Sequence, residues 1–218
     1  MQSIVSQGKE LGCQFYWLTG GEPLIKKKEV LEICRNNKDC IFLIFTNATL
    51  VDEDFCKQMN EIGNITLALS LEGNEESNDW RRGEGAYATT LKAMDLLKKN
   101  KCIFGVSVCY TRKNLPVVTS DDFVDFIISK GAKYMLNFNY MPVGHGADVS
   151  LIPTPEQRKE LYFWLPAPGR TYNSEKENIV KRNSKVLLEH FTEEDKLAFI
   201  EKYHEAWALL DSGLPIYD

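Results

Sequence analysis

Strand-like and helix-like hydrophobic patterns alternate along most of the 218 residues, and this alternation constrains the fold more than any other feature. Strands are expected at 14–18, 41–45, 65–70, 104–110 and 134–140, and helices at 2–11, 27–36, 52–62, 87–99 and 121–130. Strands separated by helices of about 10–15 residues are typical of βαβ units. We therefore predict an α/β fold, a partial parallel (β/α) barrel. Its first strand is missing, because the alternation starts with a helix.

The pattern changes near the C-terminus. A further helix is expected after the last strand, with Thr154 as N-cap and Gln157 three residues later. The segment Pro166–Gly169 then interrupts the pattern, and two charged amphipathic helices are expected after it. The sequence thus predicts a barrel domain over 1–165 and a helical tail of unknown role over 166–218.

Composition limits the classes of partner. Hydrophobic residues make up 44% of the chain and charged residues 26%, as in soluble globular proteins. A net charge of -5 argues against nucleic acid as a partner. No apolar stretch approaches the roughly 18 residues of a membrane span, and no signal peptide opens the sequence, so a cytoplasmic protein without a membrane partner is expected.

The cysteines do not form a recognisable metal site. They lie at positions 13, 34, 40, 56, 102 and 109, without a C-x-x-C pair or zinc spacing. In a reducing compartment they are interpreted as small buried hydrophobes. Cys109, near the end of a predicted strand, is the candidate exception.

The segment after the first predicted strand suits a ligand that carries an amino group. Gly20 and Gly21 expose backbone that a ligand can approach closely, because no Cβ intervenes. Glu22 adds a negative charge beside the free carbonyl groups. Pro23 has no N–H to donate, so it ends the strand.

Polar residues also follow the other predicted strands, and the carboxyl ends of parallel strands are where βα folds bind ligands. These residues are Thr46, Asn47, Thr49, Ser70, Glu72, Ser107, Cys109, Thr111, Asn137 and Asn139. Period-two alternation predicts that bulky side chains pack on the helices and that small or polar ones face inward. A site is one interpretation of this set, and turns and helix caps are the other. For Thr46, Asn47 and Thr49 both remain open.

Two arginines, Arg81 and Arg82, lie in a charged segment after Gly73 that is expected to be a loop over the barrel mouth. Guanidinium groups there would pair with a carboxylate or a phosphate. A solvated charged loop is the alternative.

Taken in order, these motifs resemble a radical S-adenosylmethionine (SAM) domain of the kind found in enzymes with a C-terminal SPASM-type extension. Gly20–Pro23 resembles the GGEP motif, and Thr46–Thr49 resembles TNGT. Four further segments resemble S-x-D/E-G, H-D, R-G and V-x-x-x-V-T-x-x-N, in that order: Ser70–Gly73, Asn78–Asp79, Arg82–Gly83 and Val106–Asn114. Met141–Gly144 resembles the turn after the next strand, so the likeness covers about residues 1–164.

The resemblance implies SAM as a cofactor and assigns its contacts. Gly20, Gly21 and Glu22 would receive the amino group, with Pro23 and Asn47 beside them. The remaining contacts would be Ser70, Glu72 and Ser107 to the ribose and methionine, Arg82 to the carboxylate, and Met141, Pro142 and Val143 to the adenine. No catalytic residue is assigned.

The chain departs from the family at the [4Fe–4S] cluster. The family's C-x-x-x-C-x-x-C loop is absent, and so is a Cys-rich extension, because Cys109 is the last cysteine. We therefore expect no metal ligands in this chain and no SAM cleavage by it. Either the first βα unit has been lost, or the true start lies upstream of Met1.

Two functions remain open from the sequence. The first is a radical SAM enzyme lineage, in which reductive cleavage of SAM gives a 5′-deoxyadenosyl radical that abstracts hydrogen from an unknown small molecule or peptide. The second is a non-catalytic or vestigial module that binds SAM or a nucleotide. An aldolase-like barrel is a distant third, because no Lys lies at a strand end.

Overall fold

The computed structural model describes residues 2–144 and 147–158. The chain divides into two units, 1–165 and 166–218, and the described residues all belong to the first. The two helices expected after Gly169 lie outside the described residues. No helix in the described part is long and apolar enough to cross a membrane.

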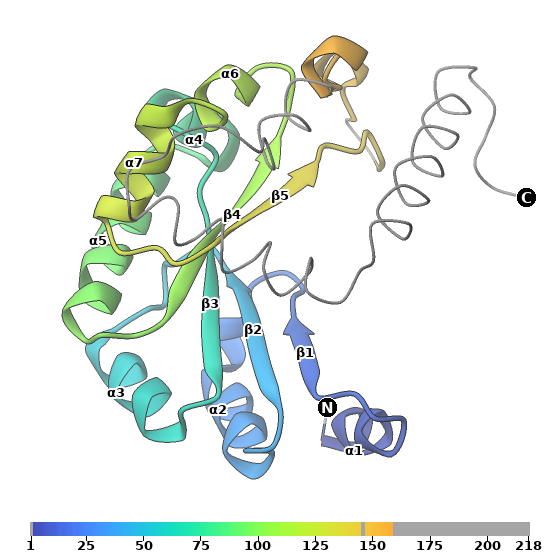
Figure 1. The fold of residues 1–218 in the computed structure, drawn as a ribbon, viewed down its shortest axis with the longest axis vertical. Coiled ribbons are helices and arrows are strands. Elements are labelled where there is room, and N and C mark those ends of the chain that lie inside the picture. Colours follow the sequence, from blue (N-terminus) through green and yellow to red (C-terminus); the bar gives the residue numbers. More distant parts are fainter. Residues whose placement is uncertain (1, 145–146, 159–218) are drawn as a thin grey trace, which may run out of the picture. The chain divides into compact units, whose positions relative to one another are not determined.

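Five parallel strands form one sheet in sequence order, curved into a half-barrel (Figure 1). They are β1 (Phe15–Leu18), β2 (Ile41–Thr46), β3 (Ile65–Ser70), β4 (Phe104–Tyr110) and β5 (Met135–Asn139). All five predicted strands are confirmed, with boundaries that differ by at most one residue. The parallel partial barrel predicted from the alternation is therefore confirmed.

One helix precedes β1, and most of the others follow the strands and cover one side of the sheet (Figure 1). They are α1 (Gln2–Glu10), α2 (Lys27–Asn36), α3 (Glu53–Ile62), α4 (Glu75–Arg82), α5 (Ala86–Lys99), α6 (Leu115–Val118) and α7 (Asp121–Ser129), with short 3-10 helices η1 (Pro23–Lys26) and η2 (Val149–Leu151). The Thr154 hydroxyl accepts from the Gln157 N–H at 3.2 Å while the Gln157 side chain accepts from the Thr154 N–H at 3.0 Å, so the predicted helix start is confirmed.

The arginine-bearing segment is a helix, which corrects the expectation of a loop. Asn74 caps α4 by accepting from the Ser77 N–H at 3.0 Å, and acidic residues fill the first turn. Because α4 is strongly polar, it lacks the apolar periodicity that predicts a helix. As a result, Arg81 and Arg82 are held on a helix rather than on a solvated loop.

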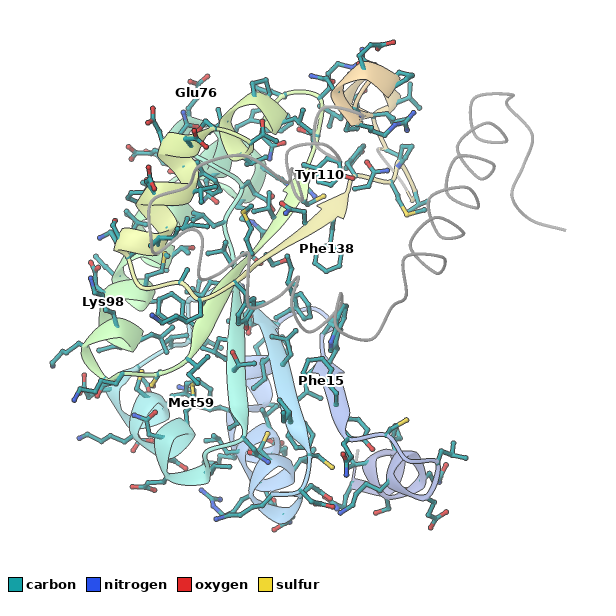
Figure 2. The ribbon with its side chains drawn as sticks, in the orientation of Figure 1. Phe15, Met59, Glu76, Lys98, Tyr110 and Phe138 are labelled. Atoms are coloured by element: carbon teal, nitrogen blue, oxygen red, sulfur yellow. The ribbon has the colours of Figure 1, made fainter. Side chains whose placement is uncertain are left out.

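The core lies between the helices and the outer face of the sheet. Leu67 and Leu69 of β3 are buried there with Val106 and Val108 of β4, as the alternation predicted. Met59 of α3 packs against the same face (Figure 2). The small inward-facing residues predicted for these two strands are therefore confirmed.

The inner face of the other strands differs from the prediction, because it carries large rings. Trp17 of β1, Phe45 of β2 and Phe138 of β5 contact one another, with ring centroids 5.4 to 6.3 Å apart. Figure 2 shows the Phe138 ring on the side of the sheet away from the helices. Bulky side chains fill barrel interiors in layers, so apolar residues at the edge strands are drawn inward as well as outward.

The expected inward placement of Asn137 and Asn139 is wrong. Register pairs Asn137 with Val108, and Met135 on the same face packs against the outer core. The Phe138 ring, 37% exposed, contacts the rings of Trp17 and Phe45 across the sheet, and these ring contacts set which face of β5 turns inward.

We predict that Ala48→Gly changes the free energy of unfolding by less than about 0.5 kcal/mol, although Ala48 is only 2% exposed. Ala48 has a φ of +71°, in the left-handed region that costs a residue with a Cβ about 1–2 kcal/mol. Relief of this strain offsets a lost methyl contact of about 0.8 kcal/mol and the greater unfolded-chain entropy of glycine. Urea unfolding of both proteins measures the difference.

Ala93→Gly is the matched control, because Ala93 is also buried but lies inside α5. It has no strain to relieve, so a loss of about 1.5–2 kcal/mol is expected. Equal destabilisation by both substitutions would contradict the argument from backbone strain.

Candidate functional site

A cleft of about 220 Å³ opens at the carboxyl ends of the strands. Its walls come from the segment after β1, from β2 and the turn after it, from the end of β3 and from α4: Thr19, Gly20, Gly21, Phe45, Thr46, Asn47, Ser70 and Arg82. Five of these are residues that the sequence predicted for the site, namely Gly20, Gly21, Asn47, Ser70 and Arg82. The volume is below the roughly 300–1,000 Å³ of small-molecule pockets, so a larger ligand would extend beyond it.

The two glycines present bare backbone to this cleft. A Cβ built on Gly20 or Gly21 would meet no atom within 4 Å. The space beside them is therefore open to a ligand rather than filled by side chains. Gly20 has a φ of +143°, which favours glycine at this position.

Glu22 fastens the turn after β1 to the end of β2. Its Oε1 accepts from the Leu24 N–H and from the Thr46 hydroxyl, both at 2.9 Å. Its Oε2 accepts from the Asn47 N–H at 2.7 Å. A carboxylate offers about four acceptor positions, so one remains for a ligand. The sequence missed Thr46 as the partner of Glu22, although a hydroxyl at the end of the adjacent strand was a signal.

The residues after β2 form a turn, which was one of the two open interpretations. The Asn47 side chain accepts from the Thr49 N–H at 3.0 Å and from its hydroxyl at 2.6 Å. Asn47 also lines the cleft, so its role as a turn former and its predicted place in the site coexist. Pro23 begins η1, with Glu22 as its N-cap.

Glu72 lies fully buried beyond the end of β3 and pairs with both arginines. Its Oε1 accepts from Arg82 Nη2 and lies 3.3 Å from Arg81 Nε. Its Oε2 accepts from the Cys109 N–H at 2.8 Å. The carboxylate predicted to face a ribose therefore binds α4 and β4, and Arg82 approaches the cleft while paired to it.

The structure brings together some predicted residues and separates others. Ser70 lines the cleft and pairs in register with Ser107, which is buried in β4. Met141 and Val143 are strongly exposed, and none of residues 141–143, Pro142 included, is among the residues that line the cleft. The predicted adenine contacts thus lie outside the cleft.

The cysteines do not fit a [4Fe–4S] cluster. Cys34 and Cys56 lie in helices, and Cys40 and Cys102 lie just before the starts of β2 and β4, so none of the four lies at the carboxyl end of a strand. Burial raises the pKa of the Cys34 and Cys56 thiols to about 12, whereas a cluster requires thiolates. No group of three or more His, Cys, Asp or Glu side chains suited to a metal occurs in the described residues.

Cys109 is the one cysteine at the cleft end of a strand. Burial raises its pKa, and the nearby Arg81 guanidinium partly opposes this. A single thiol cannot retain a cluster.

We predict that iodoacetamide at pH 8 modifies exposed Cys13 in the folded protein and leaves Cys34 and Cys56 unmodified. The thiolate is the reactive form, and a thiol with a pKa of about 12 is almost entirely protonated at this pH. Peptide mass mapping before and after addition of guanidinium chloride reports each site. Modification of Cys34 as fast as Cys13 in the folded protein would contradict the described burial.

The chain is similar in sequence to a known protein family. It matches the model of the Radical SAM superfamily over residues 2–127. An uncharacterized protein of Methanocaldococcus jannaschii is 30% identical over 72% of this chain and 56% of the relative. The mycofactocin maturase MftC of Mycolicibacterium smegmatis is 26% identical over 77% of this chain and 43% of that protein. The chain spans about half the length of the curated relatives it matches.

Solved structures share the fold. SuiB of Streptococcus suis bound to S-adenosylmethionine aligns with a TM-score of 0.59 at 18% identity, over 81% of this chain and 46% of SuiB. The same protein bound to its precursor peptide SuiA aligns with a TM-score of 0.61 at 18% identity, over 75% and 38%. The half-barrel is thus the fold of this group of proteins.

Proposed function

The chain belongs to the radical SAM superfamily, and on that premise we propose that its cleft binds SAM. The observation that carries the proposal is the convergence of Gly20, Gly21, Ser70 and Arg82 on one cleft, from three separate parts of the chain. The cleft offers acceptors for an ammonium group and a donor for a carboxylate, which are the two charged ends of the methionine part of SAM.

The chemistry of each wall suggests how the ligand is oriented. The backbone carbonyls at Gly20 and Gly21, with the remaining acceptor position of Glu22, suit the amino group. Arg82 suits the carboxylate, and Ser70 suits a hydroxyl or a carboxylate oxygen. The adenosine part exceeds the cleft and would extend toward the ends of β4 and β5, where Ser107 and residues 141–143 lie.

For the chain by itself we propose binding of SAM without its cleavage. In this family a [4Fe–4S] cluster supplies the electron for cleavage, and the cysteines of these 218 residues do not fit one. Cleavage and hydrogen abstraction from a small molecule or peptide are proposed for the lineage. SuiB has been solved with a precursor peptide, which supports a peptide as one class of substrate.

A non-catalytic SAM or nucleotide module is the second candidate. The burial and protonation of the cysteines in the helices favour it, because they leave no ready ligands for a cluster. Nucleotide binding without the amino acid part would not use the glycine backbone or Arg82. Competition between SAM and 5′-methylthioadenosine for the cleft separates binding of SAM from binding of a nucleotide alone.

We predict that Arg82→Ala weakens SAM binding by about 1.5–3 kcal/mol, through loss of a charge-assisted hydrogen bond. Isothermal titration calorimetry on the 218-residue chain measures this. Arg35→Ala is the matched control, because Arg35 is exposed on α2 and binds only Gln58 among the described residues. Equal SAM affinity in wild type and Arg82→Ala would remove Arg82 from the site.

We further predict that anaerobic reconstitution of the 218-residue chain with iron and sulfide gives neither a stoichiometric [4Fe–4S] spectrum nor 5′-deoxyadenosine in the presence of dithionite. The reason is the arrangement of the cysteines, of which Cys109 alone lies at the cleft end of a strand. Visible absorption and chromatography of the products provide the readouts. A full cluster with product would show that the cysteines have been misinterpreted.

A further inference from the structure

The Glu72 carboxylate is buried completely, yet it lies beside a cleft that would bind a charged ligand. Its two oxygens contact three groups: the Arg81 guanidinium, the Arg82 guanidinium and the Cys109 N–H. With no exposed surface, this carboxylate reaches the ligand only through the groups that it binds. Glu72 therefore acts on a ligand through the two arginines that it binds.

The main chain of Glu72 is held as firmly as its side chain. The Glu72 N–H donates to Asn78 Oδ1 at 3.0 Å. Asn114 Nδ2 donates to the carbonyls of Glu72 at 3.0 Å and Cys109 at 3.2 Å. Both amide side chains are buried. The carboxylate thus has a fixed position between α4, β3 and β4.

The two arginines are not equivalent. Arg82 lines the cleft, whereas Arg81 does not and instead lies against the Tyr140 ring, 5.7 Å from its centroid. Within the described part of the chain, Glu72 is the carboxylate that pairs with both. Two positive charges thus share one negative charge, and the cluster keeps an excess of positive charge.

The excess positive charge beside the cleft depends on Arg81. Without it, the Glu72 carboxylate would pair with Arg82 alone, and the cluster would be neutral. A neutral ion pair attracts an anionic group much less than a cation does. With Arg81 present, the charge of Glu72 is balanced by a guanidinium group that does not line the cleft, and the excess positive charge remains with Arg82.

We propose that Arg81 is a positioning residue that balances the Glu72 carboxylate, so that Arg82 presents a net positive charge to the carboxylate of the ligand. This proposal rests on the proposed function, because it takes SAM as the ligand. It reassigns Glu72, which the sequence placed on the ribose, to the support of the carboxylate contact. Arg81, to which the family resemblance assigned no SAM contact, becomes part of the site.

The test compares two ligands that differ by one group, SAM and decarboxylated SAM, in calorimetry on the full chain. Arg81→Gln should weaken SAM binding by roughly tenfold and leave the affinity for decarboxylated SAM unchanged or higher. The double variant Glu72→Gln/Arg81→Gln should regain most of the SAM affinity that Arg81→Gln loses, because no carboxylate then neutralises the charge of Arg82. Circular dichroism and thermal unfolding confirm that each variant is folded.

Each other result would overturn the proposal. Equal losses for both ligands in Arg81→Gln would mean a merely structural role, and an unchanged SAM affinity would mean that the charge of Arg81 does not act. If Arg81→Gln does not fold, the double variant decides, since a tenfold loss of SAM affinity in it contradicts the charge balance. Failure of wild type to bind either ligand would instead refute the proposed function.

Discussion

The organisation of the cleft depends on one buried ion cluster, the Glu72 carboxylate with Arg81 and Arg82. It joins three elements, because Glu72 follows β3, the arginines end α4, and the Cys109 N–H belongs to β4. A buried carboxylate is costly unless it is paired and hydrogen-bonded, and here both oxygens of Glu72 have such partners. Because burial of an unpaired Glu72 carboxylate would destabilise the fold, α4 has to end where both guanidinium groups reach Glu72.

Glu22 uses the same principle at the other side of the cleft. It accepts hydrogen bonds from two backbone N–H groups and one hydroxyl, and so ties the turn after β1 to the end of β2. Glu22 and Glu72, the acidic residues of the predicted site, thus accept most of their hydrogen bonds from groups of the protein itself. The groups that face the cleft include the backbone at Gly20 and Gly21, the Ser70 side chain and the Arg82 guanidinium.

The sequence predicted the strands well because the strands are rich in apolar residues, a pattern that is local and strong even at the edge strands β1 and β5, which bury no residue. It also predicted which strand ends converge, because parallel strands end at one edge of the sheet. It missed α4, whose polar composition gives no apolar stripe, and which is held by the Asn74 cap and by Glu72 instead. It misplaced Asn137, since which face of β5 turns inward depends on Phe138 meeting Trp17 and Phe45 across the sheet. The first error concerns a helix without an apolar stripe, and the second concerns contacts between residues far apart in sequence, and apolar periodicity contains neither.

The same limit applies to the roles of single residues. The motif residues Glu72 and Arg82 were assigned to different parts of a ligand, and the structure binds them to each other. Sequence order gives no information on whether a carboxylate near a site faces the ligand or supports a cation that does. Burial decides between these roles, because a group without exposed surface acts only through its partners. By that criterion the polarity of the cleft is set at its cationic end by a cluster of three charges, of which only the guanidinium of Arg82 reaches the cleft wall.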